Sequence, residues 1–462
     1  RPVKILQFGE GNFLRAFVDW MVDILNEKTD FNSAVQVIQP ISKGMGEILN
    51  QQDGLYHVVL KGIRDGKETS DTRLITCITS CINPYDDFQL FLKTAENPDL
   101  KFIVSNTTEA GIIFNPSDSN PEIIAESFPG KVTQLLYHRY KFFNGDNQRG
   151  FIFLPCELIE KNGENLKQTV LQVASHWSLS SDFIRWINDA NVFCNTLVDR
   201  IVPGFPKETI HDIHQSIGYD DNLVVQAEPF HLWVIEGPST VQQQFPVDKA
   251  GLSVKFVSDI TPYRTRKVRI LNGAHTAMVP VAYLGGFRTV RESIDDPAIG
   301  RYIRNAIFSE IIPTLDLSHQ ELNHFANDVM ERFQNPFIKH ELLSIALNSI
   351  SKYKVRVLPS VLEYKKRSGE LPKNLLYSLA ALIRFYKGEW NGEVIPVNDA
   401  PDVMEFFKNV WGSNDIKGIV NEVLANQSFW GQDLNKVEGI TDLVTTFLKQ
   451  IDAEPQVLTH HV

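Results

Sequence analysis

The feature that most constrains the fold of this chain is a short apolar strand that passes through two glycines into a helix, ILQFGEGNFLRAF at residues 5–17. Gly9 permits a tight turn, and Gly11 lets the backbone come close to a pyrophosphate at a helix N-terminus. Asn12 has the side chain of a helix N-cap. Leu14 replaces the third glycine of the dinucleotide fingerprint, so an ordinary strand–turn–helix is the alternative. Because the turn follows the first strand of the chain, we favour a nucleotide-binding turn.

The expected cofactor contacts come from this turn and from the ends of two later strands. The strand AVQVI is followed by Gln39, where a dinucleotide site usually has an acid that binds the ribose. Glutamine hydrogen-bonds a ribose hydroxyl without repelling a 2′-phosphate, so the residues leave NAD and NADP both open. Asn106 follows the strand KFIVS, and an ordinary polar loop is its alternative. The residues expected to bind the cofactor are Gln7, Phe8, Gly9, Glu10, Gly11, Asn12, Phe13, Leu14, Arg15, Gln39 and Asn106.

Short apolar strands alternate with amphipathic helical patterns through the first half of the chain, which predicts an α/β fold. Strands that are apolar throughout are typical of a parallel sheet covered by helices on both faces. Residues 182–199 read as a helix, and residues 224–238 read as a strand with its connections. From Lys267 onward the patterns are mostly long helices. We therefore expect a nucleotide-binding domain over residues 1–255 and a mainly helical domain over residues 256–462.

Composition narrows the possible partners. The 462 residues carry a formal net charge of -11, which disfavours nucleic acid and anionic membranes. No apolar run reaches the roughly eighteen residues that span a bilayer. The four cysteines are too scattered for a disulfide framework, and the first residues enter a strand without a signal-peptide pattern. These features predict a cytoplasmic protein with reduced cysteines.

A second motif, KVRILNGAH, occupies residues 267–275. Its neighbouring positions are apolar on nearly every side, which predicts a buried helix. At 100° per residue, Lys267, Asn272 and His275 fall within an arc of about 140° on that helix. Gly273 lies among them and costs about 1 kcal/mol relative to alanine, which makes sense if something approaches the backbone closely. Buried polar side chains on one face are costly unless they are paired or used in chemistry.

These three side chains suit carbonyl reduction and alcohol oxidation without a metal. A desolvated lysine with a lowered pKa accepts the hydroxyl proton, and an asparagine amide donates to the developing alkoxide. The histidine can orient a neighbouring hydroxyl. No clustered set of Cys and His ligands is visible, and the histidine pairs at 211/214 and 319/324 are typical of surfaces. The structural alternative is a solvent-facing lysine, a capped asparagine and a core histidine.

The K-x4-N-x2-H spacing after a first-strand GxGxFxRAF resembles the polyol-specific long-chain dehydrogenase/reductase family, which includes mannitol dehydrogenases and hexuronate reductases. Further segments follow in family order over nearly the whole chain: QDGLYHVVLKG, SNTTEAG, NTLVDRIVP and an NP…K segment. Other segments, among them LPCELIEKNG and RKVRILNGAHT, are closer to the hexuronate reductases than to the mannitol dehydrogenases.

The resemblance implies a Rossmann-type N-terminal domain with extensions, a mainly α-helical C-terminal domain and an active site in the cleft between them. It assigns Lys267 as the general acid/base and places His275 near the substrate. It gives Asn272 and Asn162 the role of donors to the oxyanion.

The residues implied to bind the substrate are Asp199, Arg264 and Lys352. Asp199 matches an acid near the reacting group; a buried partner for Arg200, or a helix end, is its alternative. Lys352 matches a substrate-contacting lysine and would otherwise read as a surface charge. Mannitol dehydrogenases carry a glutamate at the position of Arg264 and a substrate-binding arginine at the position of Ser344. These departures and the basic run YRTRKVR favour a carboxylate-bearing substrate, although a solvated helical turn also explains each arginine.

The implied reaction is the NAD-dependent, metal-independent reduction of a keto-hexuronate, with tagaturonate as the first choice. Fructuronate and fructose are the alternative substrates within the same enzyme class. A nucleotide-binding sensor without turnover and a metal-dependent dehydrogenase are the alternatives of other kinds. Since a sensor needs no proton acceptor such as Lys267, we expect an enzyme that takes NAD and a small anionic sugar, with no metal, nucleic acid or membrane partner.

Overall fold

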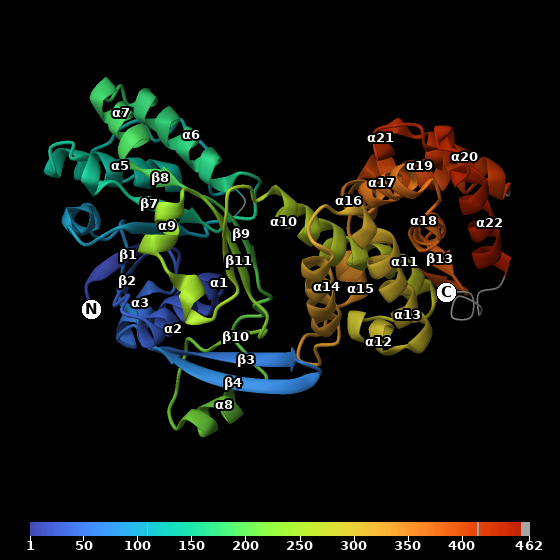
Figure 1. Ribbon diagram of the computed structural model, residues 1–462, viewed down its shortest axis with the longest axis horizontal. Coiled ribbons are helices and arrows are strands. Elements are labelled where there is room, and N and C mark those ends of the chain that lie inside the picture. The colour runs from blue at the N-terminus through green and yellow to red at the C-terminus, as the bar shows by residue number, and fades with distance from the viewer. Residues whose placement is uncertain (109, 414, 454–462) are drawn as a thin grey trace. The chain divides into compact units, whose positions relative to one another are not determined.

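A computed structural model describes residues 1–108, 110–413 and 415–453 of the chain (Figure 1). These residues form two compact units. The first contains residues 1–62 and 68–260, and the second contains residues 63–67 together with the chain from Thr261. None of the described helices is both long and apolar enough to cross a membrane.

The first unit is built on a six-stranded parallel sheet with the strand order β5-β2-β1-β6-β7-β8, which confirms the predicted α/β fold. The chain starts at the central β1 and builds outward in both directions, as in doubly wound nucleotide-binding sheets. The switch point between the two directions lies beside β1. The strands are β1 (Val3–Phe8), β2 (Ala34–Ile38), β5 (Ile78–Ile82), β6 (Phe102–Ser105), β7 (Ile152–Pro155) and β8 (Val192–Phe193).

Strand residues alternate between two hydrophobic cores, one on each face of this sheet. Ile5 packs in one core with Phe17 and Met21, whereas Leu6 packs in the other with Leu135 and Leu166. Because successive strand residues point to opposite faces, strands buried on both sides are apolar throughout. The helices of the first unit are α1 (Asn12–Leu14), α2 (Trp20–Lys28), α3 (Gly46–Gln51), α4 (Phe88–Lys93), α5 (Phe128–Phe142), α6 (Asn162–His176), α7 (Ser181–Ala190), α8 (Ile210–Ile217) and α9 (Ser239–Gln244).

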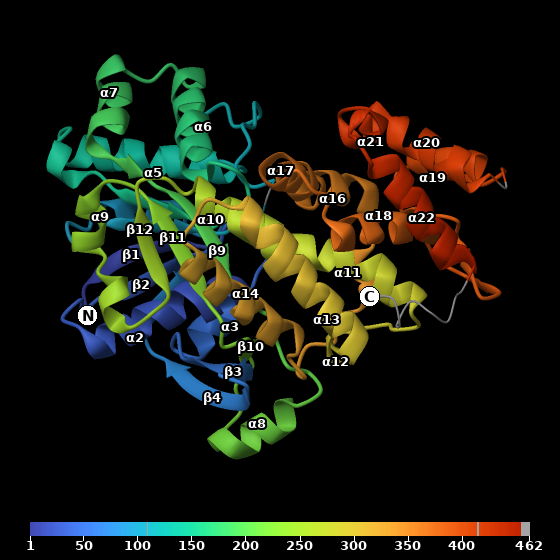
Figure 2. The ribbon, with the colours of Figure 1, turned by 45° about the vertical axis from the view of Figure 1, so that its right-hand side comes forward.

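Two three-stranded sheets, ordered β10-β3-β4 and β12-β11-β9, belong to the first unit as well, apart from residues 63–67 where β3 turns into β4 (Figure 2). The helix predicted over residues 182–199 is wrong beyond Ala190, because the later residues form β8 and β9. That segment, NVFCNTLVD, is rich in β-branched and aromatic residues, which suit strands. Residues 224–238 form two strands, not one. These strands are β3 (Tyr56–Arg64), β4 (Lys67–Ile75), β9 (Asn195–Asp199), β10 (Val225–Ala227), β11 (Leu232–Glu236) and β12 (Val254–Val257).

The second unit is mainly helical, as predicted. The helix α11 packs against α13, α16 and α18, and α22 lies beside α18 and α20 (Figure 2). Its helices are α10 (Thr261–Arg266), α11 (Gly273–Leu284), α12 (Val290–Asp295), α13 (Pro297–Asn305), α14 (His319–Phe333), α15 (Leu342–Ile345), α16 (Ser349–Arg356), α17 (Leu358–Ser368), α18 (Lys373–Phe385), α19 (Pro401–Val410), α20 (Ile416–Ala425), α21 (Gln427–Trp430) and α22 (Ile440–Ala453). A small hairpin joins β13 (Glu389–Trp390) to β14 (Glu393–Val394).

Both sequence motifs contain a π-helical turn. The Lys-Asn-His motif begins in the π segment η5 (Lys267–Asn272), which joins α10 to α11 in one continuous helix. The glycine-rich turn leads through α1 into the π segment η1 (Arg15–Asp19). A π-helix bonds residue i to residue i+5, and such turns occur frequently at functional sites.

Candidate active site

The glycine-rich turn ties together the carboxyl ends of three strands. Gly9 has a φ of 123°, a conformation that glycine alone adopts readily. Its N–H donates to the carbonyl of Ile38 on β2 (3.0 Å), and the Asn106 N–H donates to the carbonyl of Phe8 (3.3 Å). A Cβ on Gly9 would lie 3.2 Å from Leu14 Cδ1, so the residue that replaces the third glycine packs against the turn. The turn therefore lies at the switch point, where such sheets bind dinucleotides.

Gly11 faces open space. Apart from Gly11 itself and its two neighbours in the chain, no described residue has a heavy atom within 4 Å of the position that a Cβ on Gly11 would take. Its backbone is extended, with φ -68° and ψ 166°, and it directly precedes the first residue of α1. A phosphate group can approach backbone N–H groups in this position. This geometry fits a dinucleotide.

Arg15 holds the turn together from inside the protein. The prediction that Asn12 caps the helix is wrong, because the cap position is Gly11 and no side chain caps it. The Asn12 Oδ1 instead accepts a hydrogen bond from Arg15 Nη2 (2.8 Å). The Nε and Nη1 of Arg15 donate to the carbonyls of Glu10 (2.9 Å) and Leu223 (2.5 Å). Since the guanidinium is buried and fully engaged, contact between its side chain and a cofactor stays a prediction.

A buried polar network lies below the turn. Gln7 Nε2 donates to the Gly9 carbonyl (3.1 Å) and to Asp19 Oδ2 (3.1 Å), and the Tyr56 hydroxyl also donates to Asp19 Oδ2 (3.3 Å). Burial raises the pKa of the Asp19 carboxyl to about 7. Gln7 Oε1 and Asp19 Oδ1 have no hydrogen-bond partner among the residues that the structure describes. This network fixes the Gly9 carbonyl, and with it the shape of the turn.

The remaining side chains of the motif also point into the protein. Phe8 packs edge-on against Phe128, with ring centroids 5.1 Å apart, and Phe13 stacks on Phe17 at 4.9 Å. Because these rings and Leu14 are occupied by packing, we expect a dinucleotide to contact the main chain of this motif rather than its side chains.

Gln39 and Glu10 shape the loop that follows β2. Gln39 Nε2 donates to the Ile41 carbonyl (2.8 Å), and its Oε1 accepts from the Gly46 N–H (3.2 Å). Glu10 Oε1 accepts from the Met45 N–H (3.2 Å), and burial raises the pKa of this carboxyl. A cavity of about 970 Å³ opens beside the loop at the ends of β2 and β5. A cavity of this size accommodates a nucleoside. A ribose contact from Gln39 stays a prediction, because both ends of its amide are engaged.

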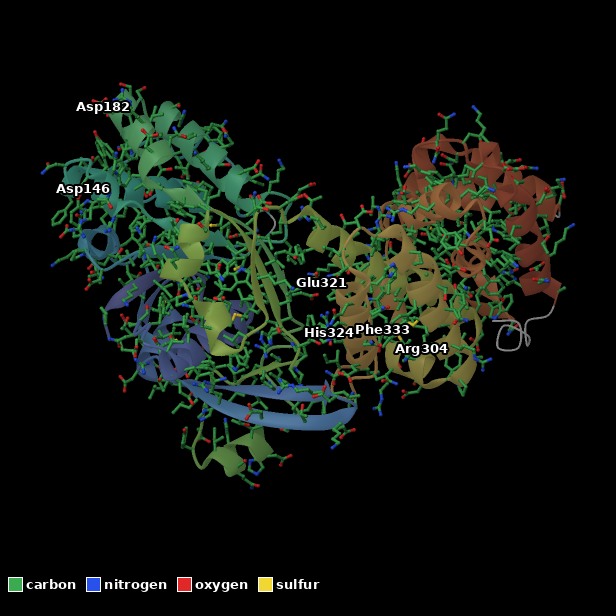
Figure 3. The ribbon with its side chains drawn as sticks, viewed as in Figure 1. Asp146, Asp182, Arg304, Glu321, His324 and Phe333 are labelled. Carbon is green, nitrogen blue, oxygen red and sulfur yellow. The ribbon has the colours of Figure 1, made fainter. Side chains whose placement is uncertain are left out.

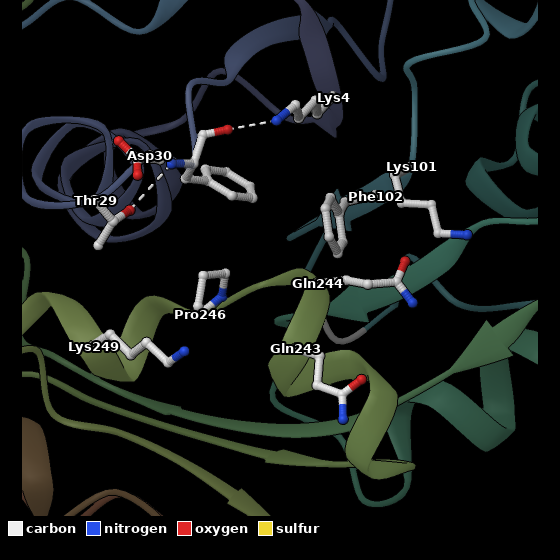
Figure 4. A pocket seen from close by; sticks show the side chains of 10 residues that line it. Lys4, Thr29, Asp30, Lys101, Phe102, Gln243, Gln244, Pro246 and Lys249 are labelled. Atoms are coloured by element: carbon white, nitrogen blue, oxygen red, sulfur yellow. Dashed lines mark hydrogen bonds between the residues drawn. The ribbon is translucent and has the colours of Figure 1, made fainter.

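A second cavity, of about 490 Å³, lies at the opposite edge of the sheet (Figure 4). It is lined by Lys4, the second residue of β1, by Lys101, which directly precedes β6, and by Lys249. Burial lowers the pKa of Lys101. Because dinucleotides bind at the carboxyl ends of the strands, this cavity is not the expected cofactor site.

The Lys-Asn-His helix differs from the predicted one in two respects. Lys267 and Asn272 are partly exposed, whereas the apolar pattern predicted burial on every side. The predicted arc assumed an α-helix, but these two residues begin and end the π segment. Residues five apart are neighbours along the axis of a π-helix, so Lys267 and Asn272 share one side. Ile270 and Leu271 occupy the buried side.

Gly273 accommodates another part of the protein. A Cβ on Gly273 would lie 3.0 Å from the carbonyl oxygen of Arg356, the last residue of α16. The close approach expected from the sequence at Gly273 is therefore explained by helix packing within the second unit.

His275 lies between an aromatic ring and a second histidine. Its ring centroid is 4.3 Å from that of Phe333, at the end of α14 (Figure 3), and 5.0 Å from that of His340. Burial lowers the pKa of His275 well below its usual value, and His340, Arg332 and Arg356 lower it further. The imidazole is therefore neutral at pH 7. Its Nε2 is buried and has no hydrogen-bond partner among the described residues, so it is available to a substrate hydroxyl.

The arginines of the basic run 263–269 lie in different environments. Arg266 is buried, donates to Glu321 on α14 (3.2 Å) and stacks over the Phe325 ring. Arg269 donates to Ser360 Oγ (3.4 Å), and burial lowers its pKa. Both side chains serve packing within the second unit. Arg264 is partly exposed on α10, and its contact with a substrate stays a prediction.

Lys352 lies on α16, and its Nζ donates to the carbonyl of Ile345 (2.8 Å). Burial lowers its pKa, and the charge of Arg356 lowers it further. The sequence reasoning missed Arg356. The sequence could have indicated it. The family resemblance had already singled out Lys352, and Arg356, four residues later, lies on the same face of the helix.

Asn162 is held firmly inside the first unit. Its Nδ2 lies 3.0 Å from each of the carbonyls of Pro155, Glu157 and Thr196. Its Oδ1 accepts from the N–H groups of Gly163 (2.9 Å) and Thr196 (2.8 Å). The amide is fully engaged, and its role as an oxyanion donor stays a prediction.

Asp199 is buried and is the last residue of β9, so it ends a strand, not a helix. Arg200 donates to the carbonyls of Glu228 (2.9 Å) and Ala16 (2.8 Å) and lies over the Trp20 ring. A substrate contact from Asp199 stays a prediction.

Within residues 1–108, 110–413 and 415–453, no three His, Cys, Asp or Glu side chains are grouped so that they could hold a metal ion. The four cysteines are buried and free.

Two family models match the chain. The mannitol dehydrogenase Rossmann domain matches residues 3–249, and the mannitol dehydrogenase C-terminal domain matches residues 259–452. The chain belongs to the mannitol dehydrogenase family. This confirms the resemblance inferred from the K-x4-N-x2-H spacing.

Several relatives within this family are similar over nearly their whole length. The altronate oxidoreductase of Phocaeicola vulgatus is 50% identical, covering 99% of this chain and 96% of the relative. The altronate oxidoreductase of Bacillus subtilis is 48% identical, covering 97% of this chain and 93% of the relative.

Two solved structures share the fold. Substrate-free D-sorbitol dehydrogenase superimposes with a TM-score of 0.84 at 22% identity, covering 99% of this chain and 95% of that one. The ternary complex of Pseudomonas fluorescens mannitol 2-dehydrogenase with NAD and D-mannitol gives a TM-score of 0.67 at 22% identity, covering 99% and 93%.

Proposed function

We propose that this chain is an NAD-dependent altronate oxidoreductase, which reduces the keto group of tagaturonate to give altronate in a reversible reaction. The observation that carries the proposal is the 46–50% identity to altronate oxidoreductases over nearly the whole chain. The departures at Arg264 and Ser344 from the mannitol dehydrogenase pattern support an anionic sugar over a neutral polyol.

The glycine-rich turn is the proposed site of the dinucleotide. The open backbone at Gly11, the left-handed Gly9 and the carboxyl edge of β1 fit a bound pyrophosphate. NADH, when bound, supplies the hydride. The presence of NAD in the mannitol 2-dehydrogenase complex supports NAD over NADP, a choice that Gln39 alone leaves open.

In the second unit, the proposed general acid/base is Lys267. During reduction its ammonium group donates a proton to the oxygen of the reacting carbonyl, and during oxidation the amine takes that proton back. Asn272, on the same side of the π turn, donates a hydrogen bond to the oxygen as negative charge develops there. The neutral His275 orients a neighbouring hydroxyl through its unpartnered Nε2.

Asn162 and Asp199 are proposed to complete the site on the basis of the family match. The hydrogen bonds of Asn162 to the ends of β7 and β9 suit a residue that fixes the local backbone. We therefore propose that it acts chiefly by positioning the segment that ends at Asp199.

The test is to compare NADH oxidation with tagaturonate, fructuronate and fructose at matched concentrations. We expect kcat/KM to be highest for tagaturonate. A preference for fructuronate or fructose would overturn the choice of substrate. Turnover of none of the three, with NADH binding retained, would favour the sensor. A metal-dependent mechanism predicts loss of activity on treatment with a chelator, whereas the proposed mechanism predicts no loss.

A further inference from the structure

Arg356 is a partly buried arginine whose guanidinium has no partner within the described part of the chain. It is the last residue of α16, and burial lowers the pKa of its guanidinium. Among the residues that the structure describes, no acidic side chain, carbonyl or aromatic ring is within bonding distance of this guanidinium. The buried arginines Arg15, Arg139 and Arg384, by contrast, each donate to carbonyl or carboxylate oxygens.

A partly desolvated charge without a partner costs free energy unless something else supplies the opposite charge. Arginine stays protonated at neutral pH, and its planar fork of donors matches a carboxylate. Arg356 therefore has the features of a side chain that binds an anionic ligand.

Arg356 lies beside the residues proposed to act on the substrate. Its carbonyl packs against Gly273, between Asn272 and His275 in the sequence. Its charge lowers the pKa of His275 on α11 and of Lys352 one turn earlier on α16. All these residues belong to the second unit, so their proximity is independent of the first.

A second arginine lies near this position. Arg332 is buried, and its charge also lowers the pKa of His275. The acid that most affects Lys352 is Asp399, which accepts hydrogen bonds from the Tyr386 hydroxyl and the Ala400 N–H. An anionic ligand is favoured in such a field.

We propose that the guanidinium of Arg356, together with the ammonium of Lys352, binds the carboxylate of the sugar-acid substrate. The inference rests on the proposed function, in which that substrate is a hexuronate. Arg356 is then the residue that distinguishes a uronate from the neutral ketose of the same shape, because a hydroxymethyl group cannot accept two hydrogen bonds from a guanidinium.

The test replaces Arg356 with Gln and compares tagaturonate with tagatose, its neutral counterpart. We expect R356Q to lower kcat/KM for tagaturonate by about 10- to 100-fold, the effect of losing a charge-assisted pair of hydrogen bonds, with a change of less than about twofold for tagatose. The affinity for altronate, measured by calorimetry in the presence of NADH, with which altronate does not react, falls by a similar factor. The matched control is R301Q, which removes an exposed arginine on α13 and leaves both substrates unaffected.

Each outcome decides a separate point. Wild-type protein that does not reduce a uronate overturns the proposed function. Wild-type protein that does, with R356Q equal to it or equally impaired on both substrates, overturns only the assignment of Arg356. If R356Q fails to fold, R356K is used instead, because lysine keeps the positive charge but lacks the paired N–H donors of a guanidinium. A selective rise in KM for tagaturonate then supports the proposal, and no rise overturns it.

Discussion

The two functional motifs of this chain use their side chains in opposite ways. Both contain a π-helical turn, η1 in the first unit and η5 in the second. Around the glycine-rich turn, the donors of Arg15 and both ends of the Gln39 amide are engaged within the protein, and the oxygens without a partner, Gln7 Oε1 and Asp19 Oδ1, lie buried below the turn. Around the Lys-Asn-His helix, His275 Nε2 and the Arg356 guanidinium have no partner among the described residues.

This difference indicates how each site meets its ligand. A dinucleotide is bound by a shaped backbone, so the side chains around it serve to hold that shape. A sugar acid is bound by side chains. Their donors and acceptors must stay unpaired in the free protein, which lowers its stability. Substitutions in the first motif should therefore act on stability or on cofactor affinity, and substitutions in the second should act on catalysis with little effect on stability.

The largest effect is expected for Lys267→Ala. Loss of a general acid/base lowers kcat by roughly 10²- to 10⁴-fold. Because Lys267 is partly exposed, the free energy of unfolding should change by less than about 1 kcal/mol. Steady-state kinetics, denaturant unfolding and NADH titration measure the three quantities, with Lys366→Ala on the exposed side of α17 as the control. An unchanged kcat would reject Lys267 as the proton donor.

Asn162→Ala should behave in the opposite way. It removes an amide that bonds three carbonyls and two N–H groups in a buried position. Leaving these groups unpaired should lower the free energy of unfolding by roughly 2–4 kcal/mol, seen as a lower denaturant midpoint. A variant as stable as the wild type but about 100-fold slower would break the comparison, because it would show Asn162 to be an oxyanion donor in the manner of oxyanion-hole amides.

Local sequence patterns predicted the parts of the fold that local chemistry determines. The strand–turn–helix at Gly9 and Gly11, the parallel sheet and the helical second unit each follow from residue periodicity and glycine positions. The family match likewise followed from the spacing of Lys267, Asn272 and His275.

Other features depend on partners distant in the sequence. Nothing near Gly273 in the chain indicates that the Arg356 carbonyl packs on it. The arc of Lys267, Asn272 and His275 was calculated for an α-helix, and the π turn that begins at Lys267 changes the angles between these side chains. The strand β9 was read as a continuation of the preceding helix although its β-branched residues favour a strand; only its pairing with β11 depends on distant sequence. Burial likewise explains why Arg266 is a packing residue and not a surface cation.

A smaller effect, and one that depends on pH, is expected for Asp19→Asn. The pKa of the Asp19 carboxyl is raised from 3.8 to about 7, chiefly by burial. Between about pH 4 and pH 7 the folded chain therefore holds a proton that the unfolded chain has lost, so this group lowers stability as the pH rises. Asparagine keeps an acceptor for Gln7 Nε2 and the Tyr56 hydroxyl and cannot ionise.

We expect Asp19→Asn to be more stable than the wild type at pH 8 by roughly 1–3 kcal/mol, and to differ little from it at pH 4, where the unfolded chain also begins to hold the proton. Denaturant unfolding at the two pH values measures the difference. Parallel pH profiles for the two proteins would mean that Asp19 is ionised in the folded state, and that the network below the turn tolerates the charge.

The smallest effect, in cofactor affinity alone, is expected for Gly11→Thr. Threonine suits both the extended backbone at this position and the helix N-cap, and its Cβ would meet no described atom within 4 Å, so stability should be unchanged. Its side chain would occupy the space through which a pyrophosphate reaches the backbone, and the Kd for NADH should rise by about tenfold.

Gly9→Ala is the contrasting variant, because a φ of 123° strains any residue with a side chain and should destabilise the fold itself by roughly 1–3 kcal/mol. Fluorescence titration with NADH, alongside unfolding curves for both variants, separates the two effects. If Gly11→Thr bound NADH as tightly as the wild type, the pyrophosphate would not pass over this backbone. The proposal that the first motif binds the cofactor through its main chain would then be rejected.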